Sequence, residues 1–200
     1  MHRNPAASSG PLVIGCVTEP VQKYIQQAAR LLLSIKWFGG EVANAPFILC
    51  TTGRLPAAAE SFFTSCGAKI VAVERVSEKH GPSNKLRFLE LSMLDNWQHI
   101  LLLDCDTILV RDPSAYMNCS GLAVKIADVP NVTSDDFKQL FSIFDMEMPS
   151  EILEHDISGT ACIPYFNSGV MLLNSSWRER FIAAWHRYNN AILEKWDSVS

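Results

Sequence analysis

The sequence predicts an α/β fold with a mostly parallel sheet flanked by helices, and two observations carry this prediction. Short apolar runs alternate with helical patterns three times before residue 98. Repeated strand–helix units of this kind form right-handed crossovers between parallel strands. In addition, the apolar run at residues 100–103 is short and bounded by polar residues, as in a strand buried on both faces of such a sheet.

The first half of the chain supplies the strand–helix units. Its apolar runs have the length of strands, and its helical segments repeat apolar residues every three or four positions. Gly39-Gly40 and Gly67 follow the first two helical segments, as glycine often does at a helix end, and Pro56 begins the second. The expected strands are residues 11–18, 46–52, 69–76 and 100–105, and the expected helices are residues 21–38, 56–66 and 85–97.

The second half of the chain changes character. Residues 128–158 are polar and acidic, with a short helix expected at residues 134–144. An apolar strand is expected at residues 169–173, followed by a helix at residues 177–196. We expect this last helix to pack on the sheet, because it carries one apolar face. That face consists of Phe181, Trp185, Tyr188, Ile192 and Trp196.

Composition indicates one globular domain at residues 11–200, preceded by a polar tail at residues 1–10. Hydrophobic residues make up 48% of the chain and charged residues 19%, which is ordinary for a globular protein. The net charge of −4, without a run of Lys or Arg, argues against a nucleic-acid partner. No stretch approaches the ~20 apolar residues of a membrane span. The six cysteines form no C-x-x-C pair, and no signal peptide is evident, so we expect a cytoplasmic protein.

The segment HILLLDCDTILVRDP, residues 99–113, is the most informative in the chain. Asp104 and Asp106 follow an apolar run and, in an extended backbone, would point to the same side. Two carboxylates held this close repel each other unless a cation lies between them. Mg²⁺ or Mn²⁺, held by carboxylates together with substrate phosphates, meets this requirement. The alternative is a strand end with two solvated carboxylates.

Three segments together resemble the family-8 glycosyltransferases, and within them the glycogenin-like branch. They are Asn84-Lys85-Leu86, the D-x-D segment at residues 99–113, and YFNSGVMLLN at residues 165–174. The resemblance covers about residues 13–185. It implies a GT-A nucleotide-diphospho-sugar transferase fold and metal-dependent transfer of a hexose with retention of anomeric configuration. It also implies a uridine diphosphate (UDP) sugar as donor, while the acceptor, whether glycan, protein or small molecule, stays open.

The resemblance also implies roles for the residues near the expected metal. Asp106 would bind Mn²⁺ or Mg²⁺ directly, and Asp104 would bridge the metal and the ribose. Cys105 lies between them and is expected to contact the bound nucleotide or metal as part of the same site. Lys85 would place a second positive charge near the diphosphate or the donor sugar, as a compact cation with three donors. The alternative for Lys85 is an exposed lysine at the start of a helix.

Further residues are expected at the two ends of the donor. Asn167, Ser168 and Gly169 precede an apolar strand, where an amide could bind sugar hydroxyls and glycine would allow close approach. Asn-Ser-Gly is equally typical of a turn. Thr18 and Tyr24 follow the first strand, where the family binds its uracil base. Tyr24 could as well be a helix residue that packs on the sheet.

The chain departs from the family pattern near its end. The family places an Asp-Gln element and a late metal-binding His after this point, and neither is present. His99, His155 and His186 are not obvious substitutes. The resemblance therefore implies that a C-terminal part is missing. For residues 1–200 alone we expect weak donor binding and negligible transfer.

Two other functions are alternatives to the transferase. The string LLLDCDTIL also resembles the first motif of haloacid-dehalogenase-like phosphohydrolases, with Asp104 as nucleophile and Asp106 as acid or base. That family carries the motif on its first strand, however, and usually has Gly where Thr107 stands. The other alternative is a non-catalytic protein that keeps the fold and binds nucleotide sugars.

Overall fold

The computed structural model describes residues 10–117, 119–127, 133–154 and 158–199. The chain divides into two compact units, which are described separately below. The first comprises Met1–Ala123 and Gly169–Ser200, and the second comprises Val124–Ser168. No helix among the described residues is both long and apolar enough to cross a membrane.

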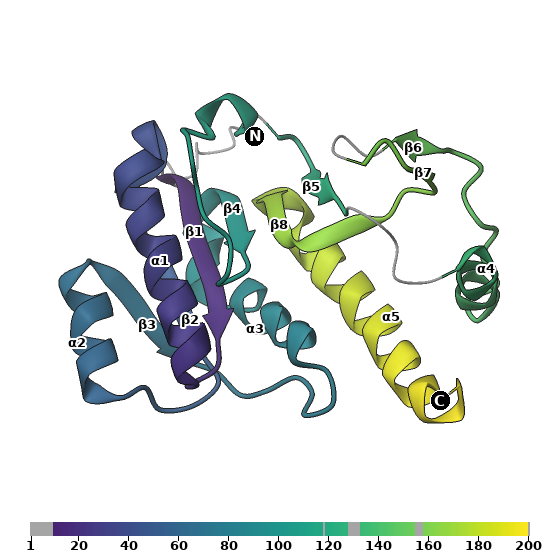
Figure 1. The fold of residues 1–200 in the computed structure, drawn as a ribbon, viewed down its shortest axis with the longest axis horizontal. Helices are drawn as coiled ribbons and strands as arrows, with labels where there is room; N and C mark the ends of the chain where they lie inside the picture. The colour runs from purple at the N-terminus through teal and green to yellow at the C-terminus, as the bar shows by residue number, and fades with distance from the viewer. Residues whose placement is uncertain (1–9, 118, 128–132, 155–157, 200) are drawn as a thin grey trace, which may run out of the picture. The chain divides into compact units, whose positions relative to one another are not determined.

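The first unit contains most of the sheet and the helices that cover it (Figure 1). Its strands are β1 (Gly10–Thr18), β2 (Phe47–Thr51), β3 (Ala68–Ala72) and β4 (Trp97–Leu103), and parts of β5 (Leu122–Ile126) and β8 (Phe166–Asn174) belong to it. Its α-helices are α1 (Gln22–Phe38), α2 (Ala57–Ser65), α3 (Leu86–Leu89) and α5 (Arg178–Val199). Short 3-10 turns are η1 (Gly40–Asn44), η2 (Gly81–Lys85), η3 (Ser92–Asn96), η4 (Ser114–Tyr116) and η5 (Ser175–Trp177).

The sheet has six strands in the order β3-β2-β1-β4-β8-β5. β1 lies between β2 and β4 and is parallel to both, and β2 is parallel to β3. β8 is antiparallel to β4, with Leu101 opposite Leu172. The predicted α/β fold with a mostly parallel sheet is therefore confirmed. One strand of the predicted set runs against the others, so the sheet is mixed.

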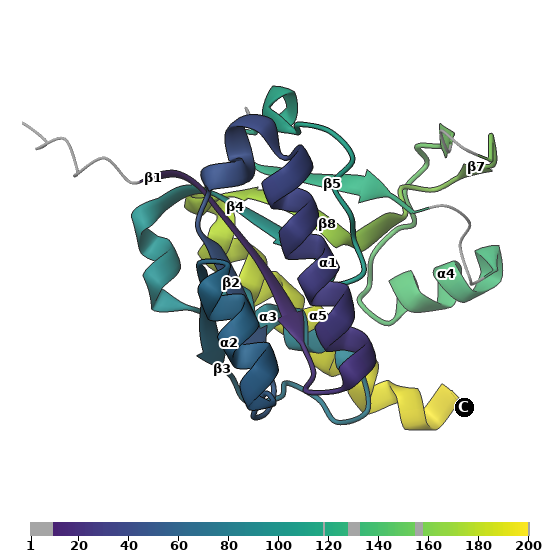
Figure 2. The same cartoon turned by 60° about the vertical axis from the view of Figure 1, so that its left-hand side comes forward.

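Helices cover both faces of the sheet, as Figure 2 shows for α1 and α2 on one side and α5 on the other. On the first face, Ile14 and Cys16 of β1 pack with Leu31 and Leu32 of α1 and with Phe63 of α2. All five side chains are at most 2% exposed. Since alternate residues of a strand face opposite sides, Gly15 faces the other way, toward α3.

Gly15 allows α3 to approach the second face closely. A Cβ added to Gly15 would lie 2.1 Å from Cε2 of Phe88, which is fully buried. α5 packs against α3, so this second layer includes the long C-terminal helix. The helix was expected to pack on the sheet. It lies over the second face of the sheet (Figure 2), where it packs against α3, and its aromatic residues Phe181, Trp185 and Tyr188 are only half-buried. The side chain of Trp196 lies outside the described residues.

The second unit holds a short helix and a hairpin. α4 (Ser134–Ser142) begins at a capping box in which Thr133 and Asp136 satisfy each other's backbone N–H groups. Phe137 of α4 makes an edge-to-face contact with Tyr165, with ring centroids 5.6 Å apart. β6 (Leu153–Glu154) and β7 (Ala161–Cys162) form an antiparallel pair. The short helix expected in the polar segment is thus confirmed.

Most predicted bounds lie within three residues of the observed ones, and two predicted elements differ more. The expected helix at residues 85–97 is wrong as a single element, because it is divided into the end of η2, then α3 and η3, with Leu91 extended between α3 and η3 and Trp97 already in β4. The third strand ends at Ala72 instead of continuing to Val76, and the backbone N–H of Val76 donates to the Oδ1 atom of Asn84.

Candidate active site

The D-x-D segment forms a turn at the carboxyl end of β4. β4 ends at Leu103, and the N–H of Thr107 donates to the carbonyl of Asp104 over 3.0 Å. The N–H of Asp104 in turn donates to the carbonyl of Gly169 over 2.8 Å. The position at the strand end is as predicted, but the extended backbone is not. A turn, typical of Asp-rich sequence, presents the two carboxylates.

Lys85 reaches this turn from η2. Its Nζ atom lies 2.7 Å from Oδ1 of Asp104, and its side chain is only 12% exposed. The lysine is therefore not the exposed residue of the alternative interpretation. A charge-assisted contact of this length at a shielded position places a positive charge directly beside the carboxylates.

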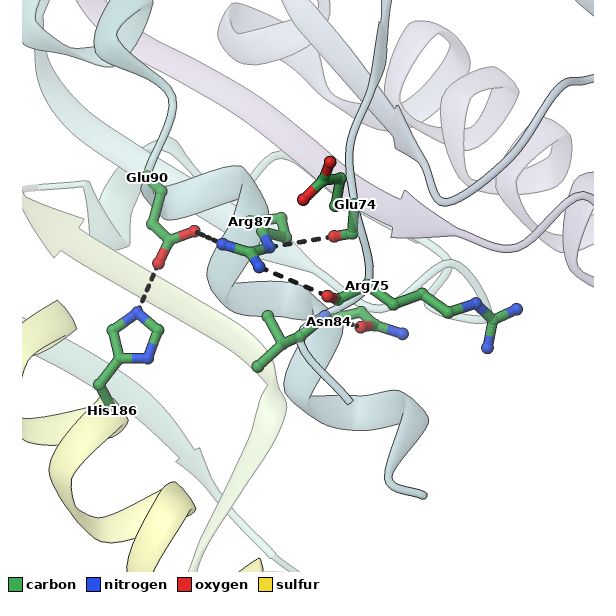
Figure 3. Close-up of polar contacts among 7 residues, drawn as sticks. Glu74, Arg75, Asn84, Arg87, Glu90 and His186 are labelled. Carbon is green, nitrogen blue, oxygen red and sulfur yellow. Dashed lines mark hydrogen bonds and ion pairs between the residues drawn. The ribbon is translucent and has the colours of Figure 1, made fainter. Parts of the chain in front are cut away.

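Neighbouring contacts fix the segment that carries Lys85 (Figure 3). The side-chain Nε and Nη2 of Arg87 donate to the carbonyls of Glu74 and Arg75 over 3.0 and 3.4 Å. Glu90 accepts from Arg87 and contacts His186 of α5. These contacts join the loop after β3, the α3 region and α5, so the backbone beside Lys85 is held from two sides.

A cavity of about 220 Å³ opens between the carboxyl end of β1, α1, η2 and the D-x-D turn. Six of the residues singled out in the sequence line it. They are Thr18, Tyr24, Lys85, Asp104, Cys105 and Asp106. Ligands in open α/β sheets bind at this edge, outside the carboxyl ends of the strands.

The thiol of Cys105 is uncharged in this setting. Burial raises its pKa to about 11, and the charges of Asp106 and Asp104 contribute in the same direction. Its Sγ lies 3.7 Å from Oε1 of Gln27, to which it donates. The anionic groups that the turn offers to a ligand are therefore carboxylate oxygens and not a thiolate.

Carboxylate oxygens fit a hard divalent cation. The described residues contain no cluster of three His, Cys, Asp or Glu side chains that could hold a metal by themselves. Mg²⁺ commonly binds through one or two carboxylates and completes its shell with water and substrate phosphates, and Mn²⁺ prefers the same oxygen ligands. The pair Asp104 and Asp106 therefore suits a metal that arrives with a diphosphate.

The remaining expected residues lie on β8. This strand begins at Phe166, so Asn167, Ser168 and Gly169 are strand residues; the turn interpretation and the expected start of the strand at residue 169 are wrong. The carbonyl of Gly169 accepts from Asp104, as described above, and also from the Thr107 hydroxyl over 3.4 Å. Asn167 and Ser168 belong to the second unit, so their placement beside the cavity stays a prediction.

Sequence reasoning missed four polar or turn residues of the cavity wall. They are Glu19, Gln27, Gly81 and Pro82. Asn84 also lines the cavity, although the sequence marks it only as part of the Asn84-Lys85-Leu86 motif. Gln27 could have been found, because it lies one helical turn after Tyr24 and shares its face. Two of the histidines are engaged elsewhere: the ring nitrogens of His99 lie near the carbonyls of Pro11 and Cys119, and His186 contacts Glu90. His155 lies outside the described residues.

The comparison with known protein families gives the class of the domain. The family described as the Rhodobacterales glycosyltransferase domain matches residues 16–199. The chain belongs to this glycosyltransferase family. No curated protein matches the sequence. For a member of a glycosyltransferase family, with three strand–helix units before the D-x-D, the phosphohydrolase alternative has no remaining support.

Solved structures show the same GT-A fold. The galactosyltransferase LgtC, in complex with donor and acceptor sugar analogues, aligns with a TM-score of 0.61 at 15% identity, over 89% of this chain and 65% of that one. The bifunctional glycosyltransferase WbbM aligns with a TM-score of 0.59 at 12% identity, over 93% of this chain and 35% of that one. The mannosyltransferase Ktr4p from S. cerevisiae aligns with a TM-score of 0.53 at 9% identity, over 94% of this chain and 62% of that one. This glycosyltransferase domain thus spans between about one third and two thirds of their lengths.

Proposed function

We propose that this glycosyltransferase domain binds a nucleoside diphosphate sugar with a divalent metal and transfers the sugar to an acceptor. The supporting observation is the cavity that brings Lys85, Asp104 and Asp106 together at the carboxyl edge of a GT-A sheet. In keeping with the family resemblance, the proposed donor is a UDP-hexose and the proposed stereochemical outcome is retention. LgtC binds donor and acceptor sugar analogues, and Ktr4p binds GDP. The experiment below therefore compares uracil with guanine as the base of the nucleotide.

In this proposal Asp106 and Asp104 hold Mn²⁺ or Mg²⁺. When bound, the cation neutralises the negative charge that develops on the diphosphate leaving group. Lys85, now paired with Asp104, orients that carboxylate and adds a positive charge close to the diphosphate. Because the Lys85 side chain is largely shielded from water, its charge acts over a short distance in a poorly screening environment.

Two further sets of residues would bind the ends of the donor. Thr18 and Tyr24, which line the cavity at β1 and α1, would contact the base, and Cys105 would pack beside the nucleotide as an uncharged thiol. Asn167, Ser168 and Gly169 would face the transferred sugar. Buried thiols at Cys16 and Cys50 suit a reducing compartment, so the proposed location is the cytoplasm.

The experiment is a binding screen followed by a donor screen. UDP and GDP are titrated into the protein with Mn²⁺ and again with EDTA. Metal-dependent binding of at least one supports the proposal, and absence of binding by both contradicts it. UDP- and GDP-sugars are then tested for release of the nucleoside diphosphate. This second screen uses a C-terminally extended chain, because negligible transfer is expected of residues 1–200 alone. Binding without release from any donor by the extended chain favours the non-catalytic binder over the transferase.

A further inference from the structure

Asn84 is a buried amide with only one of its two ends satisfied. Its residue surface is 3% exposed. Its Oδ1 accepts from the backbone N–H of Val76 over 2.8 Å. A backbone N–H can only donate, so this contact fixes which end of the amide is oxygen. The Nδ2 atom therefore points elsewhere, and it has no hydrogen-bond partner among the residues that the structure describes.

An unsatisfied buried donor is uncommon in folded proteins, because it has lost water without gaining a protein acceptor. Asn84 lines the proposed donor cavity, one residue before Lys85. The carboxylates of Glu19, Asp104 and Asp106 in the same wall are acceptors, and Lys85 is already paired with Asp104. A ligand rich in acceptor oxygens would supply what the Nδ2 group lacks.

We propose that Asn84 is a binding residue of the donor site, whose Nδ2 group donates a hydrogen bond to an acceptor oxygen of the bound nucleoside diphosphate. This inference rests on the proposed function and adds a residue to it. The Oδ1 contact with Val76 holds the amide in one orientation. The donor is therefore oriented before the ligand arrives. Because the Nδ2 atom is itself buried in the ligand-free structure, a neighbouring group of the cavity wall has to move for an acceptor oxygen to reach it.

The chain offers a matched control in Asn189 of α5. Its Oδ1 accepts from the hydroxyl of Ser83 over 2.6 Å, and its Nδ2 likewise has no partner among the described residues. Asn189 is not part of the cavity wall, in contrast to Asn84. The two amides therefore share a buried, unsatisfied Nδ2 and differ in whether the residue lines the cavity.

The test compares Asn84→Asp, Asn84→Ala and Asn189→Asp by titration of UDP with Mn²⁺. Asn84→Asp keeps an acceptor for Val76 but adds a charge, whereas Asn84→Ala adds no charge but loses that contact. The Nδ2 donor is the one feature that both remove. We expect both Asn84 variants to raise the Kd for UDP about tenfold or more, as for loss of one hydrogen bond to a charged group. Asn189→Asp should stay within about twofold of the wild type.

The ligand-free melting temperature of each variant separates binding from stability. Repeating the titration with uridine distinguishes two positions of the acceptor oxygen. If the Asn84 variants bind uridine more weakly than the wild type, the acceptor lies on the nucleoside. If they bind only UDP more weakly, it lies on the diphosphate. Weaker UDP binding in only one Asn84 variant, or an equal loss in Asn189→Asp, overturns the inference. Wild-type protein that binds neither UDP nor GDP refutes the proposed function itself, whereas unchanged binding in both Asn84 variants refutes this inference alone.

Discussion

Asp106 is the exposed carboxylate of the D-x-D turn and the proposed direct ligand of the metal. We expect UDP and Mn²⁺ together, and neither alone, to raise the melting temperature, because a ligand that binds only the folded state stabilises it. At a free ligand concentration one hundred times Kd, this stabilisation is about 2.7 kcal/mol. Asp106→Asn should abolish this increase in melting temperature with UDP and Mn²⁺ together (the joint shift) and leave the ligand-free melting temperature nearly unchanged. A thermal-shift assay measures both.

The control for this variant is Asp135→Asn. Asp135 is an exposed carboxylate of α4, paired with Lys138 at 2.8 Å in the other unit. The same change from carboxylate to amide at this position should leave the joint shift intact. A full shift in Asp106→Asn would remove Asp106 from the metal site.

Gly15 is the residue that limits how closely α3 can approach the sheet. In Gly15→Ala the new methyl group would overlap the ring of the fully buried Phe88. We expect a loss of about 1–3 kcal/mol in the free energy of unfolding, the usual cost of overpacking a core. Gly81→Ala is the comparison, since its nearest neighbour would be Oε1 of Glu19 at 3.7 Å. Urea denaturation without ligand measures both, and equal stability of the two variants would contradict the packing argument.

At the scale of elements, the contact between α3 and α5 depends on Glu90. Burial alone would raise the pKa of this carboxyl group, but hydrogen bonds and charges from Arg87 and His186 outweigh burial and hold it below its ordinary 4.5. The ionised form is therefore favoured in the folded state. Its contribution is fully present above about pH 4.5 and is lost as the pH falls through the lower, folded-state value.

Glu90→Gln tests this linkage. The variant should be less stable than the wild type at neutral pH, by up to about 1 kcal/mol for a partly exposed pair. The difference should shrink as the pH is lowered below the ordinary value of 4.5, because the wild type loses its advantage on protonation. Melting temperatures recorded as a function of pH provide the measurement. A difference that does not change with pH would mean that Glu90 contributes by packing alone.

Local periodicity predicts β1, α1, β2 and α2 closely, because each buries one pattern of apolar residues against the same layer. It fails after Lys85. Leu86, Leu89 and Met93 continue the spacing of a helix, yet Leu91 is extended and its carbonyl accepts from Arg178, 87 residues further along the chain. A distant contact of this kind overrides helix propensity and leaves no signature in the segment itself.

The candidate site shows the same limit. Lys85, Asp104 and Asp106 could be found because motifs mark them, and the structure brings them together. The role of Asn84 could not be found, because its unsatisfied Nδ2 exists only once Val76 has occupied the other end of the amide. The antiparallel direction of β8 could not be predicted either, because the polar segment before it has no periodicity that indicates whether the chain re-enters the sheet parallel or antiparallel to β4.

At the scale of the whole molecule, the reactivity of two buried thiols indicates whether the sheet is folded. Cys16 of β1 and Cys50 of β2 are fully buried. Burial raises the pKa of Cys50 to about 12 and also raises that of Cys16, where the nearby Cys105, Cys50 and Asp104 add to the effect. The reactive thiolate is therefore scarce at neutral pH, and reagents cannot reach the sulfur.

We expect neither thiol to react with iodoacetamide until the domain unfolds globally, because both lie in central strands. Cys66, which is only half-buried at the end of α2, should react earlier. Mass spectrometry of labelled peptides across a urea series gives the order. Labelling of Cys16 or Cys50 in the native protein at the rate of Cys66 would show that the sheet opens locally.

The hydrogen bond from Asp104 to the carbonyl of Gly169 has a consequence for biosynthesis. The D-x-D turn is complete only when β8 has paired with β4, and β8 comes more than sixty residues later in the chain. A nascent polypeptide that has emerged only as far as α4 therefore carries both carboxylates without the strand that shapes their turn. We therefore expect the proposed metal binding through this turn only after β8 has been synthesised, and an interrupted translation product would keep the motif without the shaped turn.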